Sequence, residues 1–248
     1  MTAGRVAVVT GAAQGIGAAT AHRLARDGVA LALLDVVPKV EAVAAAIAAA
    51  GGRAIALHCD VSSETDWADA VRTCRDRLGP VDVLVSNAYT VDVRPAHETS
   101  TPSWERQIAV NLTGAFLGVR ECLPDLRRHR RGAVVLVSSV HAVIGLPGRA
   151  AYASAKAGLT GLTRQLAAEY GTEVRVNAVL PGPVLTAAWD GIGEDDRRAS
   201  AEQTVVGRLG RPEEVAAVIA FLAGDDASFV TGASVPVDGG WSVYKTSS

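Results

Sequence analysis

The sequence has little net charge, few cysteines and no long uncharged hydrophobic run. The formal net charge of its 248 residues is −2, and no basic tract interleaved with aromatic residues occurs, which argues against a nucleic-acid-binding surface. No segment approaches the ~18 uncharged apolar residues of a membrane-spanning helix. The N-terminus also lacks the charged lead and apolar core of a signal peptide. We therefore expect a soluble cytoplasmic protein that binds neither nucleic acid nor membranes.

Cysteine is scarce and its positions carry no motif. Cys59, Cys74 and Cys122 are odd in number, lie far apart and show no spacing that is typical of a metal site or a redox pair. Such residues fit reduced, mostly buried thiols in a reducing compartment. We expect no metal ion in this protein.

What the sequence does contain is a regular alternation of short apolar runs and helical patterns. Hydrophobic residues make up 49% of the chain, which indicates an extensive buried core. Strands are expected at Arg5–Thr10, Val29–Asp35, Ala54–Cys59, Val81–Ser86, Ala133–Ser138, Val174–Leu180 and Ala233–Val237. Helices are expected at Ile16–Asp27, Val40–Ala50, Ser63–Leu78, Thr101 to about Arg128, Ala150–Tyr170 and Pro212–Ala223. The alternation predicts one α/β domain over residues 1–248, a doubly wound parallel sheet with helices on both faces.

Polar or glycine residues follow the expected strands at the point where each strand ends. Ligands of an open parallel sheet bind beyond the carboxyl ends of its strands, at the topological switch point. The residues in these positions are Gly11, Asp35, Asp60, Asn87 and Ser139. Their shared placement predicts a single site at that edge.

The turn after the first strand is rich in glycine. It reads TGAAQGIG over Thr10–Gly17, between a strand and a helix. Glycines permit a tight turn and a close approach of the backbone to a pyrophosphate, and the following helix offers free N–H groups to phosphate. The spacing G-x-x-x-G-x-G differs from G-x-G-x-x-G, so a simple turn is the alternative.

Two aspartates suggest how a nucleotide would be held. Asp35 ends the second strand, where a carboxylate can accept hydrogen bonds from ribose hydroxyls and repel a 2′-phosphate. Val36 and Val37 follow it rather than arginine, which favours NAD over NADP; a capping or solvated Asp35 is the alternative. Asp60 could hold the adenine amino edge or cap the next helix.

A serine, a tyrosine and a lysine form the candidate catalytic group. Tyr152 and Lys156 are spaced i and i+4, so in a helix they lie on one face about 5–6 Å apart. A nearby ammonium is expected to favour the phenolate and so suit Tyr152 to acid–base chemistry. Ser139, at the end of a strand, could hold a carbonyl or carbinol oxygen. Of 24 Lys and Arg residues only three are lysine, which makes the lysine at position 156 notable.

Taken together, these motifs resemble the short-chain dehydrogenase/reductase family from about residue 5 to 240. The resemblance implies a Rossmann-like fold, a nicotinamide cofactor and a homotetramer whose tails and long helices pack between subunits. It implies the catalytic residues Asn111, Ser139, Tyr152 and Lys156, with Asn111 holding a water for proton relay and Lys156 on the nicotinamide ribose. It implies the cofactor-binding residues Gly11, Gln14, Gly15, Ile16, Gly17, Asp35, Asp60, Val61, Asn87, Ala88, Tyr152, Lys156, Pro181, Gly182, Val184 and Thr186.

The chain departs from the family after the fourth strand. Where the family has Asn-Asn-Ala-Gly, this chain has Ser86-Asn87-Ala88-Tyr89. A tyrosine is strained at a position that needs a positive φ, unless the loop is rearranged. Tyr89 could form a wall of the substrate pocket or pack on the adjacent loop.

The expected substrate pocket is apolar and aromatic. Residues 185–210 are predicted to form an irregular lid over it. His141 could bind a polar substrate group or assist the relay, but a hydrogen-bonded loop histidine is the simpler interpretation. The residues expected to form the walls of the pocket are Tyr89, Val91, Ser139, His141, Val143, Leu185 and Trp189. No arginine is evident among them, which favours a neutral, moderately hydrophobic substrate.

These features predict an NAD-dependent oxidoreductase that interconverts a secondary alcohol and a ketone. Ionised Tyr152 would accept the hydroxyl proton, with Lys156 and a positive nicotinamide ring both favouring the phenolate. The substrate would be a small alcohol or ketone. There are two alternatives. One is a non-redox epimerase or lyase on the same fold, and the other is a dinucleotide-binding regulator without turnover.

Overall fold

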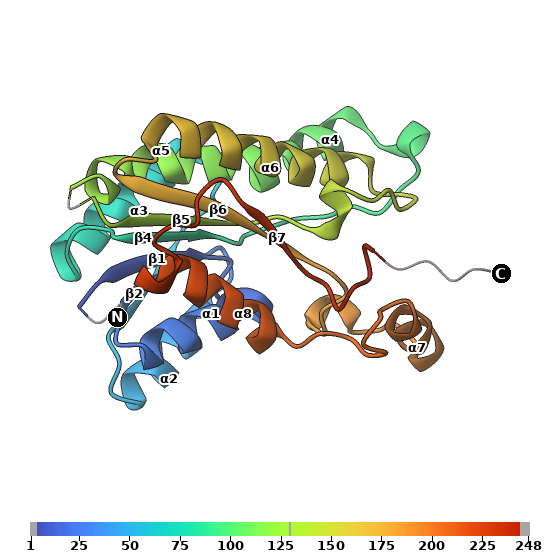
Figure 1. The fold of residues 1–248 in the computed structure, drawn as a ribbon, viewed down its shortest axis with the longest axis horizontal. Coiled ribbons are helices and arrows are strands. Elements are labelled where there is room, and N and C mark those ends of the chain that lie inside the picture. Colours follow the sequence, from blue (N-terminus) through green and yellow to red (C-terminus); the bar gives the residue numbers. More distant parts are fainter. Residues whose placement is uncertain (1–3, 129, 244–248) are drawn as a thin grey trace.

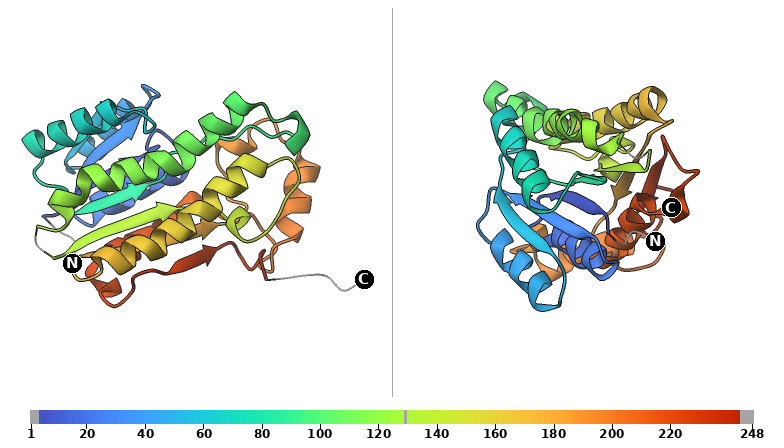
Figure 2. Two further views of the ribbon diagram at one scale, coloured as in Figure 1. Left: turned by 90° about the horizontal axis from the view of Figure 1, so that it is seen from above. Right: turned by 90° about the vertical axis from the view of Figure 1, so that its left-hand side faces the viewer.

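Residues 4–128 and 130–243 of this computed structural model are described here, and they form a parallel sheet between two layers of helices (Figures 1 and 2). The seven strands of this described part are β1 Val6–Thr10, β2 Ala30–Asp35, β3 Ala54–His58, β4 Val83–Ser86, β5 Gly132–Val137, β6 Val174–Pro181 and β7 Ser234–Val237. They pair in the order β3-β2-β1-β4-β5-β6-β7. The predicted doubly wound α/β sheet is confirmed.

Helices follow most of the strands, as the alternation predicts. The helices of the described residues are α1 Gly15–Arg26, α2 Val40–Ala49, α3 Glu64–Arg77, α4 Thr101–Ile108, α5 Gly114–Leu126, α6 Ala150–Tyr170, α7 Glu194–Glu202 and α8 Pro212–Ala223. Short 3-10 turns lie at Ala96–Glu98, Val140–Ala142, Ala187–Trp189 and Asp225–Ala227. No described helix has the length and apolarity that crossing a membrane requires.

The sheet is hydrophobic on both faces because helices cover both. One core lies under α3, α5 and α6, and the other lies under α1, α2 and α8. This explains the nearly continuous apolar runs in the strands, which are typical of parallel sheets. The three cysteines are free and buried in the first of these cores.

The predicted long helix from Thr101 is interrupted rather than continuous. A π-helical turn, η2 (Ala109–Thr113), separates α4 from α5 and contains Asn111. Such turns are rare in proteins and are frequent at functional sites. A five-residue π-helical turn is shorter than the window in which helical periodicity is recognised, so the sequence pattern does not predict it.

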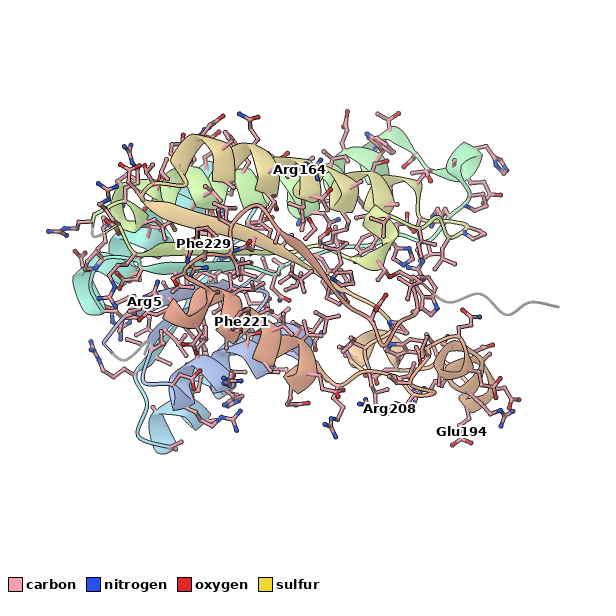
Figure 3. The ribbon with its side chains drawn as sticks, in the orientation of Figure 1. Arg5, Arg164, Glu194, Arg208, Phe221 and Phe229 are labelled. Atoms are coloured by element: carbon pink, nitrogen blue, oxygen red, sulfur yellow. The ribbon has the colours of Figure 1, made fainter. Side chains whose placement is uncertain are left out.

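The carboxyl ends of the strands all meet at one edge of the sheet. The chain reverses its direction of strand addition between β1 and β4, which creates the switch point there. Arg5, just before β1, lies at the opposite end of the molecule from Glu194 of α7 (Figure 3). The α7 segment is joined to this edge by a bridge between Val184 and Gly210. The site therefore lies between the strand ends and residues 185–210.

Candidate active site

A cavity of about 900 Å³ lies at the carboxyl edge of the sheet. Its size suits a small-molecule ligand together with part of a cofactor. The sequence-predicted residues that line it are Gly11, Gln14, Gly15, Ile16, Asp35, Asp60, Val61, Asn87, Ala88, Tyr89, Val91, Ser139, His141, Tyr152, Lys156, Pro181, Gly182, Val184, Thr186 and Trp189. The structure thus brings nearly all of the predicted residues to one site.

Four predicted residues do not line the cavity. Val143 is 63% exposed and Leu185 is 47% exposed, so neither forms a wall of this cavity, and their contact with substrate stays a prediction. Residues 140–142 form a 3-10 turn, and Val143 follows it outside the cavity lining. Gly17 lies beneath the glycine-rich turn, and Asn111 is buried behind the cavity wall.

The glycine-rich turn fits a nucleotide pyrophosphate. Gly11 and Gly15 have φ of +63° and +56°, which other residues rarely adopt. A Cβ on Gly17 would lie 2.1 Å from the Gly11 carbonyl oxygen, so α1 can pack against the turn only with glycine there. The first turn of α1 has no acidic residue and its N-cap side chain makes no capping hydrogen bond. The N–H groups at this helix end are available for phosphate.

Asn87 ties the ends of β1 and β4 together at the switch point. Its Nδ2 donates to the carbonyl oxygens of Thr10 (2.9 Å) and Gly11 (3.1 Å). The Thr10 hydroxyl accepts from the backbone N–H of Asn87 and of Ala88 in turn. These bonds hold the floor of the cavity in place before any ligand binds.

Asp35 is neither a helix cap nor simply solvated. Its two oxygens accept from the backbone N–H of Ala13 (2.9 Å) and of Val37 (3.0 Å). Each carboxylate oxygen has further lone-pair capacity, so it can still accept a ribose hydroxyl. Asp35 lines the cavity and braces the glycine-rich turn, which fits the residue set expected for a dinucleotide.

Asp60 lies just before α3 but does not cap that helix. Ser63 is the N-cap, with its hydroxyl accepting from the Asp66 N–H. One Asp60 oxygen accepts from the Ser62 N–H and hydroxyl, and the other pairs with Arg106 at 3.1 Å. Hydrogen bonds from Ser62 and Arg106 outweigh burial and lower the pKa of the Asp60 carboxyl. Asp60 is therefore an ionised, fixed wall of the cavity.

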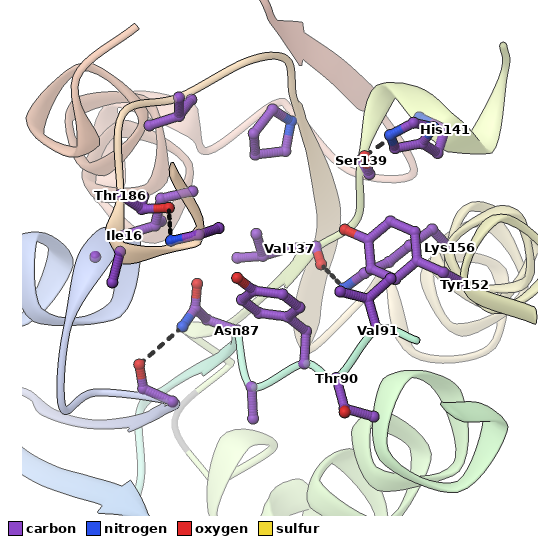
Figure 4. A pocket seen from close by; sticks show the side chains of 18 of the residues that line it. Ile16, Asn87, Thr90, Val91, Val137, Ser139, His141, Tyr152, Lys156 and Thr186 are labelled. Carbon is purple, nitrogen blue, oxygen red and sulfur yellow. Dashed lines mark hydrogen bonds between the residues drawn. The ribbon is translucent and has the colours of Figure 1, made fainter. Parts of the chain in front are cut away.

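Tyr152 and Lys156 extend from the first turns of α6 toward the end of β5 (Figure 4). The Lys156 Nζ donates to the Val137 carbonyl oxygen at 2.8 Å and lies 5.5 Å from the centre of the Tyr152 ring. Ser139, two residues after β5, is buried beside them. A phenol, a serine hydroxyl and a buried ammonium thus converge on one corner of the cavity, as the spacing predicts.

The expectation that Lys156 makes Tyr152 acidic is wrong for the chain by itself. Burial raises the pKa of the Tyr152 phenol to about 12, although hydrogen bonding by Ser139 and the charge of Arg149 both act to lower it. Burial also lowers the pKa of Lys156 to about 7. The sequence argument considered the spacing of the two groups and not the desolvation of both.

Asn111 connects η2 to the loop that carries Tyr89. Its Nδ2 donates to the carbonyl oxygens of Thr90 (2.7 Å) and Gln107 (2.9 Å), and its Oδ1 accepts from the Thr90 N–H (3.2 Å). Asn111 is 2% exposed. Its side chain therefore positions the Tyr89–Thr90 loop, and its role in a proton relay stays a prediction.

Tyr89 is accommodated without backbone strain. Among the described residues Arg130 is the one non-glycine with a positive φ, so Tyr89 does not occupy a glycine-only conformation. Its ring lies 6.4 Å from that of Tyr152, edge to face, and it lines the cavity. The loop therefore holds Tyr89 in an ordinary backbone conformation, with its side chain as a wall of the cavity.

His141 faces the ring of Tyr152 at 5.7 Å and that of Trp241 at 6.4 Å. Its buried Nδ1 has no hydrogen-bond partner among the described residues, so the interpretation as a hydrogen-bonded loop histidine fails for that atom. Burial, followed by the charge of Arg149, lowers the pKa of His141 to about 4. His141 is a neutral imidazole at physiological pH.

Several lining residues were not predicted from the sequence. They include Thr90, Val93, Arg106, Leu146, Arg149 and Trp241, whereas Ile192 and Gln203 belong to the predicted lid at residues 185–210. Arg149 could have been identified, because it lies three residues before Tyr152 and so begins the same helix. Trp241 could not, since only the folded chain brings the C-terminal segment to the cavity.

The chain matches known proteins over most of its length. Residues 11–242 match the sequence family described as enoyl-(acyl carrier protein) reductase. The chain is 44% identical to cis-4-hydroxycyclohexanecarboxylate dehydrogenase of Sinomonas cyclohexanicum, over 96% of each chain. It is 36% identical to cyclopentanol dehydrogenase of Comamonas testosteroni, again over 96% of each. The crystal structure of levodione reductase superposes with a TM-score of 0.90 at 36% identity, covering 98% of this chain and 99% of that one. The chain belongs to the short-chain dehydrogenase/reductase family of NAD(P)-dependent oxidoreductases.

Proposed function

We propose that this protein interconverts a secondary alcohol on a carbon ring and the corresponding cyclic ketone, with NAD(H) as cofactor. The observation that carries the proposal is the convergence of Ser139, Tyr152 and Lys156 on one corner of a cavity with apolar walls. Two relatives are named for cyclic alcohols, cyclopentanol and a hydroxycyclohexanecarboxylate. An aromatic wall made by Tyr89 suits a compact ring.

Binding of the dinucleotide cofactor is assigned to the residues already described at the carboxyl edge of the sheet. The glycine-rich turn would hold the pyrophosphate, Asp35 the ribose, and Asp60 with Val61 the adenine. Pro181 to Thr186 would contact the nicotinamide end, and Lys156 its ribose. When bound, the nicotinamide ring supplies or accepts the hydride.

Tyr152 is the proposed acid and base. Its pKa of about 12 keeps the phenol protonated at neutral pH, which suits it to donate a proton to a ketone oxygen. In the direction of oxidation the phenolate is needed, and cations near the ring favour it. The Ser139 hydroxyl would hold the reacting oxygen next to the phenol. Asn111 would contribute by fixing η2, where a relay water is expected.

Residues 185–210 are proposed to cover the substrate. Both ends of this segment are anchored by hydrogen bonds, from the Leu185 N–H to the Gly210 carbonyl (2.8 Å) and from the Gly210 N–H to the Pro183 carbonyl (2.9 Å). Between them Trp189 and Ile192 line the cavity. A segment hinged at one bridge can open for a substrate without disturbing the sheet.

The proposed function is tested by absorbance at 340 nm with NAD⁺ and a panel of alcohols. Cyclohexanol, cyclopentanol and cis-4-hydroxycyclohexanecarboxylate represent ring alcohols, and 2-butanol represents open-chain ones. We expect NADH to form faster with a ring alcohol than with 2-butanol. Turnover of 2-butanol alone would contradict the choice of ring substrates.

A preference for NADH over NADPH is expected from Asp35. A 2′-phosphate carries close to two negative charges and would be repelled by this carboxylate, and no cation follows it in Val36 and Val37. We expect NADH to bind at least about tenfold more tightly, equivalent to about 1.4 kcal/mol. Asp35→Asn should narrow that ratio, and Glu41→Gln, exposed on α2, should not. The test is a fluorescence titration with both nucleotides; tighter binding of NADPH by the wild type would refute the assignment.

A homotetramer in the cytoplasm is the proposed working form. Trp104 of α4 and Phe116 of α5 are 40% and 44% exposed on the helices where the resemblance expects subunits to meet. Large exposed apolar side chains on neighbouring helices favour an interface. Light scattering should give about four times the chain mass of 25.5 kDa; a monomeric mass would contradict the proposal.

A further inference from the structure

The charged side chains that line the cavity are nearly all accounted for. Asp60 pairs with Arg106, Asp35 accepts from two backbone N–H groups, and Lys156 donates to the Val137 carbonyl. Both aspartates lie at the end of the cavity formed by β2 and β3. The remaining charged residue of the lining is Arg149.

Arg149 has a free guanidinium next to the catalytic corner. Within the part of the chain that the structure describes, its side chain forms no hydrogen bond and no ion pair, although the residue is half-buried. Arg149 lines the same cavity as Tyr152 and His141 and directly precedes the helix that carries Tyr152, which places it on the substrate side. Its charge acts on both of those groups. An unpaired, partly desolvated arginine in a binding cavity is a strong site for an anion.

The backbone that carries Arg149 is held firmly. Arg149 forms an isolated β-bridge with Arg94, in which the Arg94 N–H donates to the Gly148 carbonyl at 2.9 Å. The Arg94 Nε donates to both carboxylate oxygens of Asp92, at 3.1 and 3.0 Å, so the charge of Arg94 is paired, and Arg94 is not among the residues that line the cavity. The bridge therefore fixes the backbone of Arg149, the one lining arginine without a partner among the described residues, next to an arginine whose charge is already paired.

We propose that Arg149 binds a carboxylate of the substrate, so that the natural substrate is a ring alcohol or ring ketone that also carries a carboxylate group. This inference rests on the proposed function and names its substrate class. It replaces the neutral substrate expected from the sequence. With the hydroxyl at Tyr152 and Ser139, the carboxylate lies one helical turn away, because Arg149 directly precedes α6. The planar guanidinium matches a carboxylate through two parallel hydrogen bonds.

A purely electrostatic role for Arg149 makes a different prediction. If the residue only favours the phenolate of Tyr152, its loss lowers kcat for every substrate and shifts the pH profile upward. If it binds the substrate, its loss raises KM for carboxylate substrates and not for uncharged ones, so the carboxylate-to-amide ratio in kcat/KM falls whatever the effect on Tyr152. The two roles are separated by comparing a carboxylate with its uncharged amide.

The experiment compares cis-4-hydroxycyclohexanecarboxylate with cis-4-hydroxycyclohexanecarboxamide in wild type, Arg149→Gln and Arg149→Lys. We expect wild type to favour the carboxylate in kcat/KM by at least tenfold. In Arg149→Gln the KM for the carboxylate, and not for the amide, should rise about 10- to 100-fold, the range expected when a charge-assisted hydrogen bond is lost. Arg149→Lys should recover part of that loss. Arg164→Gln, on the outer side of the same helix (Figure 3), should match wild type.

Binding of cyclohexanecarboxylate, which has no hydroxyl to oxidise, gives a measurement that does not depend on turnover. Calorimetry with the NADH-saturated protein should show binding to wild type and a loss of about tenfold or more in Arg149→Gln. Equal affinity of the two proteins, or an unchanged carboxylate-to-amide ratio in Arg149→Gln, would overturn the anion site. Absence of turnover with every ring alcohol would instead overturn the proposed function, with the calorimetric comparison still deciding on Arg149.

Discussion

Replacing Tyr152 by phenylalanine is expected to reduce kcat by about 10²- to 10⁴-fold, the range for removing a general acid–base group. The change deletes only the hydroxyl, and the ring remains in contact with Tyr89, His141 and Lys156. The cavity should keep its shape, so NADH should bind with nearly unchanged affinity. The loss would then arise in the transition state and not in ground-state binding.

The matched control is Tyr170→Phe at the other end of α6, where the ring stacks with the Arg127 guanidinium 5.9 Å away. Stopped-flow measurement of hydride transfer and a fluorescence titration with NADH would be run on both variants. Turnover of Tyr152→Phe near that of wild type would remove this residue from the chemistry. Loss of NADH binding in Tyr152→Phe would point to a structural role for the hydroxyl.

The fold and the location of the site were predictable because strand ends determine both. A buried parallel strand must be apolar along its length, so polar residues such as Asp35 and Asn87 mark where it stops. All strands of this sheet are parallel, so the polar residues at their carboxyl ends lie at one edge of the sheet. Residues near in sequence to a strand end were therefore placed correctly.

The features that the sequence did not predict depend on the surroundings of each side chain in the folded protein. The spacing of Tyr152 and Lys156 indicates that they are neighbours but not that both are desolvated, and desolvation dominates their pKa values. The sequence did not predict the 3-10 turn at Val140–Ala142, after which Val143 lies outside the cavity lining. The free guanidinium of Arg149 becomes evident only once the partners of the other lining charges are known, since the sequence contains many arginines.

We expect the buried amine of Lys156 to lower the stability of the fold, and its replacement by methionine should reveal that effect. The wild-type side chain is 2% exposed and its one hydrogen bond is to the Val137 carbonyl. Burial lowers the pKa of Lys156 to about 7, whereas an unfolded lysine titrates near 10.4. Below pH 7 the folded protein therefore carries a charge that the core disfavours. Methionine has a similar shape and no charge.

We expect Lys156→Met to lose most turnover, yet at pH 6 and without nucleotide to be about 1–3 kcal/mol more stable than wild type. That range is the free-energy cost of desolvating the Lys156 ammonium, reduced by the cost of leaving the Val137 carbonyl without its hydrogen bond in the variant. As pH rises above about 7 the folded lysine deprotonates while the unfolded one stays protonated, so wild-type stability increases toward pH 10. The difference in free energy of unfolding between Lys156→Met and wild type should therefore shrink over that pH interval. The titration of Tyr152 does not contribute to this difference because both proteins contain Tyr152.

Urea denaturation at pH 6, 8 and 9.5 measures the difference, with Lys39→Met as the control for an exposed lysine. A variant that is both inactive and less stable than wild type at pH 6 would mean that the Lys156 ammonium stabilises the fold, and the argument from desolvation would fail. A variant that is inactive but more stable would mean that the lysine is kept for chemistry alone. A buried charge that weakens the fold is expected where catalysis needs that charge, and here it lies next to the phenol that we propose exchanges a proton.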